Sequence, residues 1–374
     1  MAFEPRVLAR GDFDALIRAL VDRGYQVVGP TVRDDAIVYE PISSTADLPI
    51  GIGDTQDGGT YRLTQRDDDA LFGYNLGPHS WKKYLFPPKL ELWQAKRENG
   101  SVKFVSSQSE PRRYAFLGIR ACELAAISVQ DRVFVKGSHS DPHYVSTRGE
   151  ILTVGVNCAV AGGTCFCVSM GTGPRVESGY DIVLTEVITD GSHQFVCEAG
   201  SDRGAEIVES LPTSPATEND VLTVDSILEQ TARNMGRVLE TTGLPELLAG
   251  NPEHPRWDEV ASRCLACTNC TLVCPTCFCS TTEDATSLAT GEATRSRRWD
   301  SCFALDFSEL HGTPARSSTK ARYRHWMTHK LSTWHDQFDV SGCVGCGRCI
   351  TWCPVGIDIT EESAAIRATA GALT

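Results

Sequence analysis

RCLACTNCTLVCP at residues 263–275 and GCVGCGRCITWCP at residues 342–354 are two copies of one cysteine pattern, which decides the fold of the C-terminal part of the chain. In each copy two, two and three residues separate four cysteines, and a proline follows the last. In two-cluster ferredoxins this spacing lets three cysteines of a run bind one [4Fe–4S] cluster while the fourth binds the other. The pattern therefore predicts two [4Fe–4S] clusters that transfer single electrons. The predicted ligands are Cys264, Cys267, Cys270 and Cys353 for the first cluster, and Cys343, Cys346, Cys349 and Cys274 for the second.

Two other roles of closely spaced cysteines fit this pattern less well. Pairs of cysteines often hold structural zinc, but a zinc site leaves the third cysteine of each run and both Cys-Pro endings without a use. Disulfides between such near neighbours would be strained, and they are rare in reducing compartments. A zinc-stabilised scaffold without redox activity stays open as a function of another class.

The composition is that of an ordinary globular protein. The chain has 374 residues, of which 41% are hydrophobic and 22% charged, so two or three domains are expected. No stretch approaches the length of a membrane span, and the first residues do not resemble a secretory signal. Sixteen cysteines without such a signal predict metal ligands and a cytoplasmic location. The net charge of −13 argues against a nucleic-acid partner.

Hydrophobic patterning predicts alternating helices and strands before the first cysteine run. Helices are predicted over 12–23, 122–134 and 219–243, and strands at 25–29, 36–42, 113–119, 151–157 and 181–187. Such alternation is typical of an α/β domain. The expected architecture is an N-terminal portion of α+β and α/β character, followed by a two-cluster ferredoxin-like module with a long insert. The expected domains are an α+β region over 1–110, an α/β domain over 111–250 and the ferredoxin-like domain over 251–374, with its insert at about 276–340.

A second group of cysteines lies in the predicted α/β domain. Cys158, Cys165 and Cys167 follow a predicted strand in GVNCAVAGGTCFC, and Cys122 lies where a strand meets a helix. Because a helix N-terminus favours a thiolate and thiols at adjacent strand ends can converge, these four predict a third [4Fe–4S] cluster. The alternative is that some are inert buried cysteines, which behave as small apolar side chains. Cys197, which alternates with apolar neighbours, is predicted to be a core residue.

Three further cysteines and a basic stretch lie in the insert. Cys277, Cys279 and Cys302 are predicted to pack around a cluster, and the alternative is a further metal site that lacks an evident fourth ligand. The basic residues either offset the negative charge of a cluster and dock an acidic partner, or form a solvated face paired with nearby carboxylates. They are Arg295, Arg297, Arg298, Arg316, Lys320, Arg322, Arg324 and Lys330.

No motif for chemistry on a substrate accompanies these cysteines. The sequence has no glycine-rich dinucleotide fingerprint after a strand, no Walker loop, no His-Glu-x-x-His pair and no nucleophile elbow. No catalytic residue is therefore predicted, and the chain is expected to relay electrons rather than to convert a substrate. A self-sufficient flavin reductase is a rival function, which would require flavin bound to the isolated chain.

Several longer motifs resemble one family of electron-transfer subunits. They include GPHSWKKYLFPP (77–88), RACELAAISVQDRVF (120–134), NCAVAGGTCFCVSMGTGP (157–174), CPTCFC (274–279) and CVGCGRCITWCP (343–354). Together they resemble the β subunit of cytosolic bidirectional nickel–iron hydrogenases of the sulfhydrogenase type, and the A-type subunit of anaerobic sulfite reductase from the same family. The likeness covers nearly the whole chain.

The resemblance implies a role inside a larger assembly. It implies that the eight cysteines of the two runs are ligands, and it supports the additional set at Cys122, Cys158, Cys165 and Cys167. The partners that it implies are a flavin-containing iron–sulfur subunit that binds NAD(P)H, a hydrogenase small subunit with further clusters, and a large subunit with the nickel–iron centre. The expected function is electron relay between them, and the corresponding A-type subunit of a sulfite reductase complex is the alternative.

Overall fold

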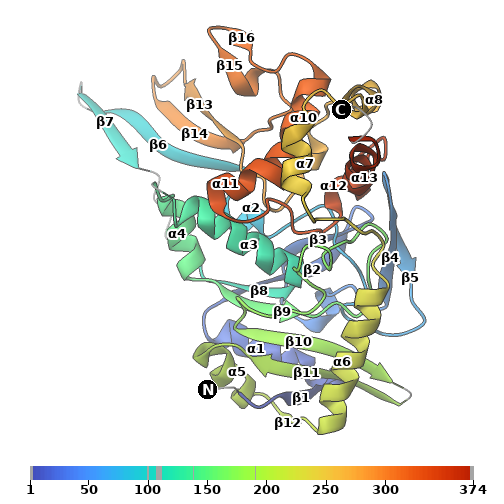
Figure 1. Cartoon of the computed structure of the whole chain (residues 1–374). Helices are drawn as coiled ribbons and strands as arrows, with labels where there is room; N and C mark the ends of the chain where they lie inside the picture. Colours follow the sequence, from blue (N-terminus) through green and yellow to red (C-terminus); the bar gives the residue numbers. More distant parts are fainter. Residues whose placement is uncertain (1–2, 99–100, 107–111, 138, 190, 371–374) are drawn as a thin grey trace.

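The computed structural model describes residues 3–98, 101–106, 112–137, 139–189 and 191–370. Its largest element is an eight-stranded mixed sheet with the order β12-β1-β11-β10-β9-β8-β2-β3 (Figure 1). The central strands β2, β8, β9 and β10 are parallel, and the outer pairs are antiparallel. The strands are β1 (Arg6–Ala9), β2 (Gln26–Arg33), β3 (Ala36–Pro41), β8 (Tyr114–Ile119), β9 (Leu152–Val156), β10 (Ile182–Thr189), β11 (Ser192–Ala199) and β12 (Thr213–Pro215).

Helices cover both faces of this sheet, as expected for parallel strands that are apolar on both sides. On one face Phe13 and Leu16 of α1 share a core with Leu117 of β8. On the other face Ile127 of α3 and Tyr144 of α4 share a core with neighbouring strand residues. The helices of this part are α1 (Phe13–Asp22), α2 (Lys82–Leu85), α3 (Ala121–Phe134), α4 (Pro142–Gly149), α5 (Asp202–Ser210) and α6 (Glu218–Arg233), with 3-10 turns η1 (Arg10–Asp12) and η2 (Thr45–Asp47).

The cysteine runs lie in a second layer of short helices, drawn in yellow to red above the sheet in Figure 1. These helices share a core that includes Trp257, Tyr323, Trp326 and Met327. They are α7 (Leu244–Gly250), α8 (Arg256–Arg263), α9 (Asn269–Leu272), α10 (Thr319–Thr328), α11 (Trp334–Phe338), α12 (Arg348–Thr351) and α13 (Ile359–Thr369), with the π-helix η4 (His329–Thr333) between α10 and α11 and the 3-10 turn η3 (Asp306–Ser308).

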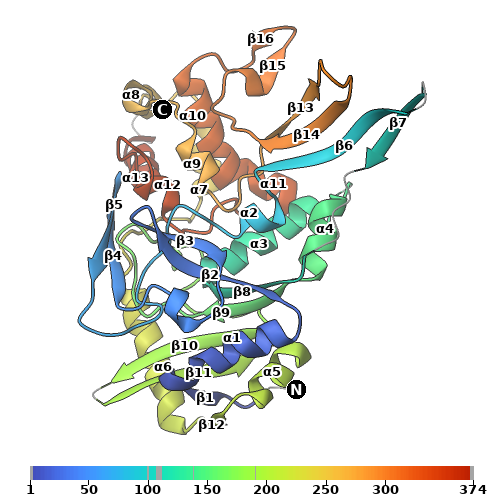
Figure 2. The ribbon, with the colours of Figure 1, turned by 180° about the vertical axis from the view of Figure 1, so that it is seen from behind.

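A four-stranded antiparallel sheet with the order β13-β14-β6-β7 joins distant parts of the sequence (Figure 2). β14 pairs with β6, although the two strands lie far apart in the chain. The strands are β6 (Lys89–Glu98), β7 (Ser101–Ser106), β13 (Ser280–Thr286) and β14 (Ala293–Trp299), and two separate hairpins are formed by β4 (Ile52–Asp57) with β5 (Thr60–Gln65) and by β15 (Glu309–Leu310) with β16 (Thr313–Pro314).

The structure confirms most of the predicted elements and corrects one. All five predicted strands are present, and the helices predicted over 12–23 and 122–134 are α1 and α3. The helix predicted over 219–243 ends at Arg233 as α6. Gly236 lies so close to Gly163 that a Cβ atom there would be 2.2 Å from the carbonyl carbon, and Arg237 donates its backbone N–H to the Cys165 carbonyl at 2.9 Å. The helix ends early because the residues that follow it pack and hydrogen-bond against the loop that contains Gly163 and Cys165.

The expected domain boundary near residue 110 does not coincide with a boundary of the large sheet. Strands β1 to β3 precede it and strands β8 to β12 follow it, yet all belong to one sheet. The expected insert is likewise joined to the N-terminal part through the pairing of β14 with β6.

Candidate iron–sulfur sites

The first cysteine run folds around a cavity. The chain leaves α8 at Arg263 and turns through Ala266 and Thr268, whose φ angles are +50° and +72°. Such angles at non-glycine residues cost about 1 kcal/mol or more and persist where the surroundings hold them. The four cysteines predicted to share the first cluster all line this cavity: Cys264, Cys267, Cys270 and Cys353.

The same cavity connects the first set of cysteines to the second. Cys349, predicted for the second cluster, also lines it, together with Tyr323 and Trp326. Both aromatic side chains are at most 4% exposed, so this wall excludes water. Cys267, in contrast, is exposed on the protein surface.

The second run forms a loop that approaches other backbone closely. Gly345 and Gly347 have φ angles of +65° and +73°, and a Cβ atom on Gly345 would lie 2.6 Å from the backbone of Phe166. Only glycine permits both the angles and the approach. The Phe166 N–H donates to the Gly345 carbonyl at 2.8 Å, so the loop is fixed against the segment that carries Cys165 and Cys167.

The four sulfurs predicted for the second cluster lie near one another. Burial raises the pKa of Cys349 well above its ordinary value, and the thiolates of Cys343, Cys346 and Cys274 raise it further. Burial likewise raises the pKa of Cys343 to about 12. Several buried thiols close together oppose one another's ionisation. Their ionisation becomes favourable when a metal group binds the thiolates, so such a set of thiols suits a metal site.

The structure also brings together Cys122, Cys158, Cys165 and Cys167. Burial raises the pKa of Cys122 well above its ordinary value, with Cys167 and Cys346 as the next contributors. Burial raises the pKa of Cys165 to about 12, with Cys158 next. The advantage predicted for a Cys122 thiolate at the start of α3 is therefore outweighed by burial. Cys346, a predicted ligand of the second cluster, therefore also lies near this third set of cysteines.

Two buried arginines lie beside these cysteines with donors that have no partner. Arg120 and Arg348 are 2% and 1% exposed, and among the described residues neither Nε of Arg120 nor Nη1 of Arg348 has a hydrogen-bond partner. Arg120 is a neighbour of Cys158, and Arg348 is a neighbour of Cys346. Buried donors without acceptors are rare. These donors fit an anionic group held by the cysteines, as an iron–sulfur cluster with thiolate ligands would be.

The buried carboxylate of Glu123 accepts hydrogen bonds from both the large-sheet layer and the cysteine-rich layer, and we call this contact the junction. Glu123 Oε1 accepts a hydrogen bond from Arg348 Nη2 at 2.5 Å, and Oε2 accepts from Tyr39 Oη at 2.9 Å and Trp81 Nε1 at 3.0 Å. It also accepts from the backbone N–H of Arg120 at 3.1 Å. Glu123 forms an ion pair with the guanidinium of Arg348, whereas the guanidinium of Arg120 donates to backbone carbonyls, so its positive charge is left to be balanced by the thiolates.

The remaining cysteines of the insert lie near predicted ligands, since Cys277 interacts with Cys274 and Cys302 interacts with Cys270. The Cys277 thiol donates to Cys274, and the Cys302 thiol donates to Cys279. The latter bond, together with Lys330 and Lys82 nearby, lowers the pKa of Cys279 to about 7 against the effect of burial. Cys197 is 1% exposed within the core of the large sheet, which confirms its prediction as a core residue.

Most of the basic residues in the insert are paired with carboxylates, in agreement with the solvated-face alternative. Lys330 is different, because it is 3% exposed and its Nζ donates to the Cys274 sulfur at 3.3 Å. The paired residues are Arg295 with Asp284, Arg297 with Asp141, Arg298 with Glu283, Lys320 with Asp258, and Arg324 with Glu253.

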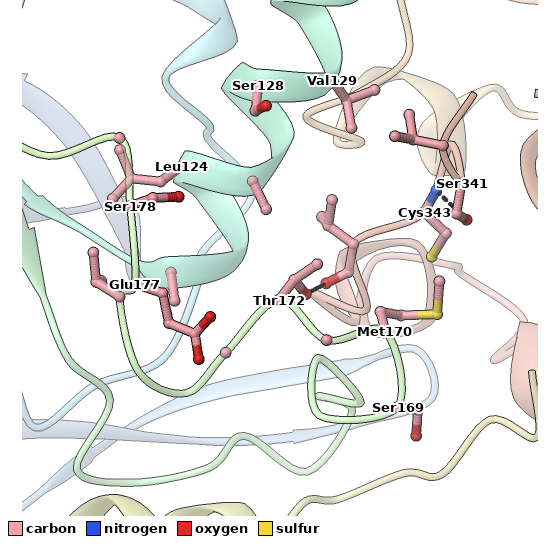
Figure 3. A pocket seen from close by; sticks show the side chains of 18 of the residues that line it. Leu124, Ser128, Val129, Ser169, Met170, Thr172, Glu177, Ser178, Ser341 and Cys343 are labelled. Atoms are coloured by element: carbon pink, nitrogen blue, oxygen red, sulfur yellow. Dashed lines mark hydrogen bonds between the residues drawn. The ribbon is translucent and has the colours of Figure 1, made fainter. Parts of the chain in front are cut away.

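A wide cavity of about 1140 Å³ lies next to the second set of cysteines (Figure 3). It is lined by one side of α3, the segment 169–179 and the segment 340–344. Thr172 Oγ1 donates to the Val344 carbonyl at 2.7 Å, and the Cys343 N–H donates to Ser341 Oγ at 3.1 Å. Cys343 is therefore part of one wall of an open cavity.

The functional residues missed by sequence reasoning are the buried charges Lys82, Arg120, Glu123 and Arg348. Arg120, Glu123 and Arg348 lie within two residues of predicted ligands, in the motifs RACE and CGRC. A charged residue inside an otherwise apolar cysteine motif was the sequence signal that could have identified them.

In the described part of the chain no group of three or more His, Cys, Asp or Glu side chains is arranged to hold a metal ion. Nor do the described residues include a helix long and apolar enough to cross a membrane.

Comparison with known proteins agrees with this arrangement. The 4Fe-4S dicluster domain family matches residues 263–357. Sulfhydrogenase 2 subunit beta of Pyrococcus furiosus is 29% identical over 315 residues, which cover 82% of this chain and 89% of that protein. No solved structure matches the chain. The chain therefore contains a 4Fe–4S dicluster domain, and over most of its length it is similar to a sulfhydrogenase beta subunit.

Proposed function

We propose that the chain transfers electrons within a sulfhydrogenase-type complex, through [4Fe–4S] clusters bound by the three sets of cysteines. The likeness to sulfhydrogenase 2 subunit beta supports the type of complex, and the dicluster domain supports the clusters. The proposed ligands are Cys264, Cys267, Cys270 and Cys353 in the first set, Cys274, Cys343, Cys346 and Cys349 in the second, and Cys122, Cys158, Cys165 and Cys167 in the third.

The observation that supports this proposal is the order of the three sets of cysteines, which we call a row because the second set adjoins both the first and the third. Cys349 of the second set lines the cavity of the first, and Cys346 of the second set adjoins the third. Clusters bound there would supply one-electron donors and acceptors in series. The chain itself holds the thiolates, excludes water with Tyr323 and Trp326, and offsets negative charge with buried cations.

We also propose cytoplasmic partners at the ends of this row. The first set is nearest the surface, where Cys267 is exposed and Leu265 and Val355 are 64% and 37% exposed. An exposed apolar surface beside a redox group suits transient binding of another redox protein. The proposed partners are a flavin-containing iron–sulfur subunit that oxidises NAD(P)H and the small and large subunits of a nickel–iron hydrogenase.

The proposal is tested by measuring iron and acid-labile sulfide in anaerobically purified protein. Three clusters give about twelve irons per chain and two give about eight, since each contains four. Cys346→Ser is expected to lower the iron content by about four per chain. Cys197→Ser, which changes another buried cysteine outside the row, is the matched control and should retain all the iron. Wild-type protein that contains zinc and no iron would reject the proposal in favour of a scaffold.

A further inference from the structure

Two buried lysines contact the turn that follows the first cysteine run. Lys82 on α2 and Lys330 in η4 are 4% and 3% exposed. Lysine is almost never buried this completely without a partner, because removing its charge from water is costly. The groups that balance these two positive charges therefore indicate where negative charge lies in the site.

Lys330 contacts the proposed ligand Cys274 directly. Its Nζ donates to Cys274 Sγ at 3.3 Å, to Thr276 Oγ1 at 3.0 Å and to the Gly342 carbonyl at 3.0 Å. It belongs to a π-helical segment within the run from α10 to α11. Such widened turns change the direction of a side chain and are frequent at functional sites.

Lys82 holds the backbone of the same turn. Its Nζ donates to the carbonyls of Leu272, Cys274 and Cys277 at 3.3, 2.9 and 3.2 Å, and lies 4.0 Å from the centre of the Trp299 ring. Three carbonyls saturate the donors of an ammonium group. Lys82 therefore fixes the position of Cys274 without contacting its sulfur.

The negative charge near these lysines comes from sulfur. Within the described ranges, neither lysine forms an ion pair with a carboxylate, whereas surface lysines such as Lys320 do. For Lys330 that charge is on the sulfur of Cys274, to which its Nζ donates at 3.3 Å. Burial lowers the pKa of Lys82, in keeping with its contacts to neutral carbonyls.

Among the described residues, no lysine or arginine is seen to donate to a sulfur of the first set, although the buried Arg322 lies near Cys264. In this set Cys264 Sγ accepts from the backbone N–H of Ala266 at 3.4 Å, and Cys353 Sγ accepts from that of Ile357 at 3.3 Å. The second set has Lys330 on Cys274 and Arg348 beside Cys346. Net charge and hydrogen bonds to sulfur are what set the potential of an iron–sulfur cluster.

We propose that Lys330 is a positioning residue that raises the reduction potential of the second cluster above that of the first, while Lys82 holds the turn that presents Cys274. This inference depends on the proposed function, because it requires the second set to bind a cluster. A positive charge next to a ligand sulfur stabilises the reduced cluster, which carries one more negative charge. Electrons shared between the first and second clusters would therefore reside mainly on the second.

The test is a potentiometric titration of the whole iron-loaded chain, followed by electron paramagnetic resonance, for wild type, Lys330→Met and Lys320→Met. In Lys330→Met one cluster signal should shift to lower potential, with at least a tenfold fall in its reduced-to-oxidised ratio at fixed potential, or 59 mV for one electron. Lys320→Met, on the neighbouring helix α10 but paired with surface carboxylates, should leave every midpoint unchanged. Lys330→Arg, which keeps the charge, should restore the potential.

Lys330→Gln separates the charge from the packing, because it retains a hydrogen-bond donor of similar length but is neutral. It should shift the same signal in the same direction. Unchanged midpoints in both neutral variants with full iron content would overturn the inference. So would folded variants that lose iron from the second site, since Lys330 would then serve assembly instead. A wild-type chain without iron would instead reject the proposed function on which the inference depends.

Discussion

Individual residues in this protein show how burial shifts the protonation of polar groups around the cysteines. The same physical cause acts on His79, whose backbone carbonyl accepts a hydrogen bond from Arg348 Nη2 at 2.8 Å. Burial lowers the pKa of His79 to about 4, and the nearby charge of Lys83 lowers it further. A histidine in an unfolded chain has a pKa of about 6.5. Between these two values the unfolded state binds more protons than the folded state, so stability decreases as the pH falls.

His79→Gln should therefore make stability less sensitive to acid. We expect a smaller loss of melting temperature between about pH 7 and about pH 5 in the variant than in the wild type, because the proton-linked difference between the two states is removed. Thermal unfolding at the two pH values, with the same buffer ions, measures this difference. An identical loss in both proteins would show that His79 titrates alike when folded and unfolded.

At the level of elements, close backbone contacts decide where helices end. Gly236, just beyond α6, packs on Gly163, where a Cβ atom would be 2.2 Å from the carbonyl carbon. Gly236→Ala must displace one of these segments, and overpacking of this kind costs about 1–3 kcal/mol. Gly250→Ala is the matched control, because a Cβ atom there would meet nothing within 4 Å. Denaturant unfolding of both variants checks the prediction, and equal stabilities would contradict the contact.

The same element shows how far sequence patterns reach. Periodicity predicts α3 and the central strands because their apolar residues face two cores of the same sheet, and cysteine spacing predicts which residues gather around the first cavity. The end of α6 could not be predicted, since it depends on a glycine contact with a loop 73 residues earlier in the chain. Lys82 was missed for a related reason, because it precedes Cys274 by a long stretch of sequence and only the fold brings it there. Lys330 was among the basic residues predicted to offset the charge of a cluster, but its contact with Cys274 likewise depends on the fold.

Over the whole molecule, the cysteine-rich layer and the large sheet are joined by buried polar contacts. Arg348 lies between Cys346 and Cys349 in one layer, and Glu123 follows Cys122 in the other. Arg348→Met would leave Glu123 buried without its guanidinium partner, which should cost about 3–5 kcal/mol. Arg33→Met is the comparison, because the Arg33–Glu40 pair is at the surface and is worth at most about 1 kcal/mol.

Denaturant unfolding of the two arginine variants measures both costs. The loss in Arg348→Met should appear as an earlier unfolding transition of the whole chain, because the junction is shared by both layers. An effect no larger than that of Arg33→Met would mean that the junction contributes little to holding the layers together.

The pairing of β14 with β6 also matters while the protein is being made. On the ribosome β6 and β7 emerge long before β13 and β14, so one side of this ribbon stays unpaired until the late strands arrive. Open strand edges of this kind invite association with other nascent chains. Translation must therefore pass Trp299 before this sheet can close, so a product truncated before β14 should be prone to aggregation.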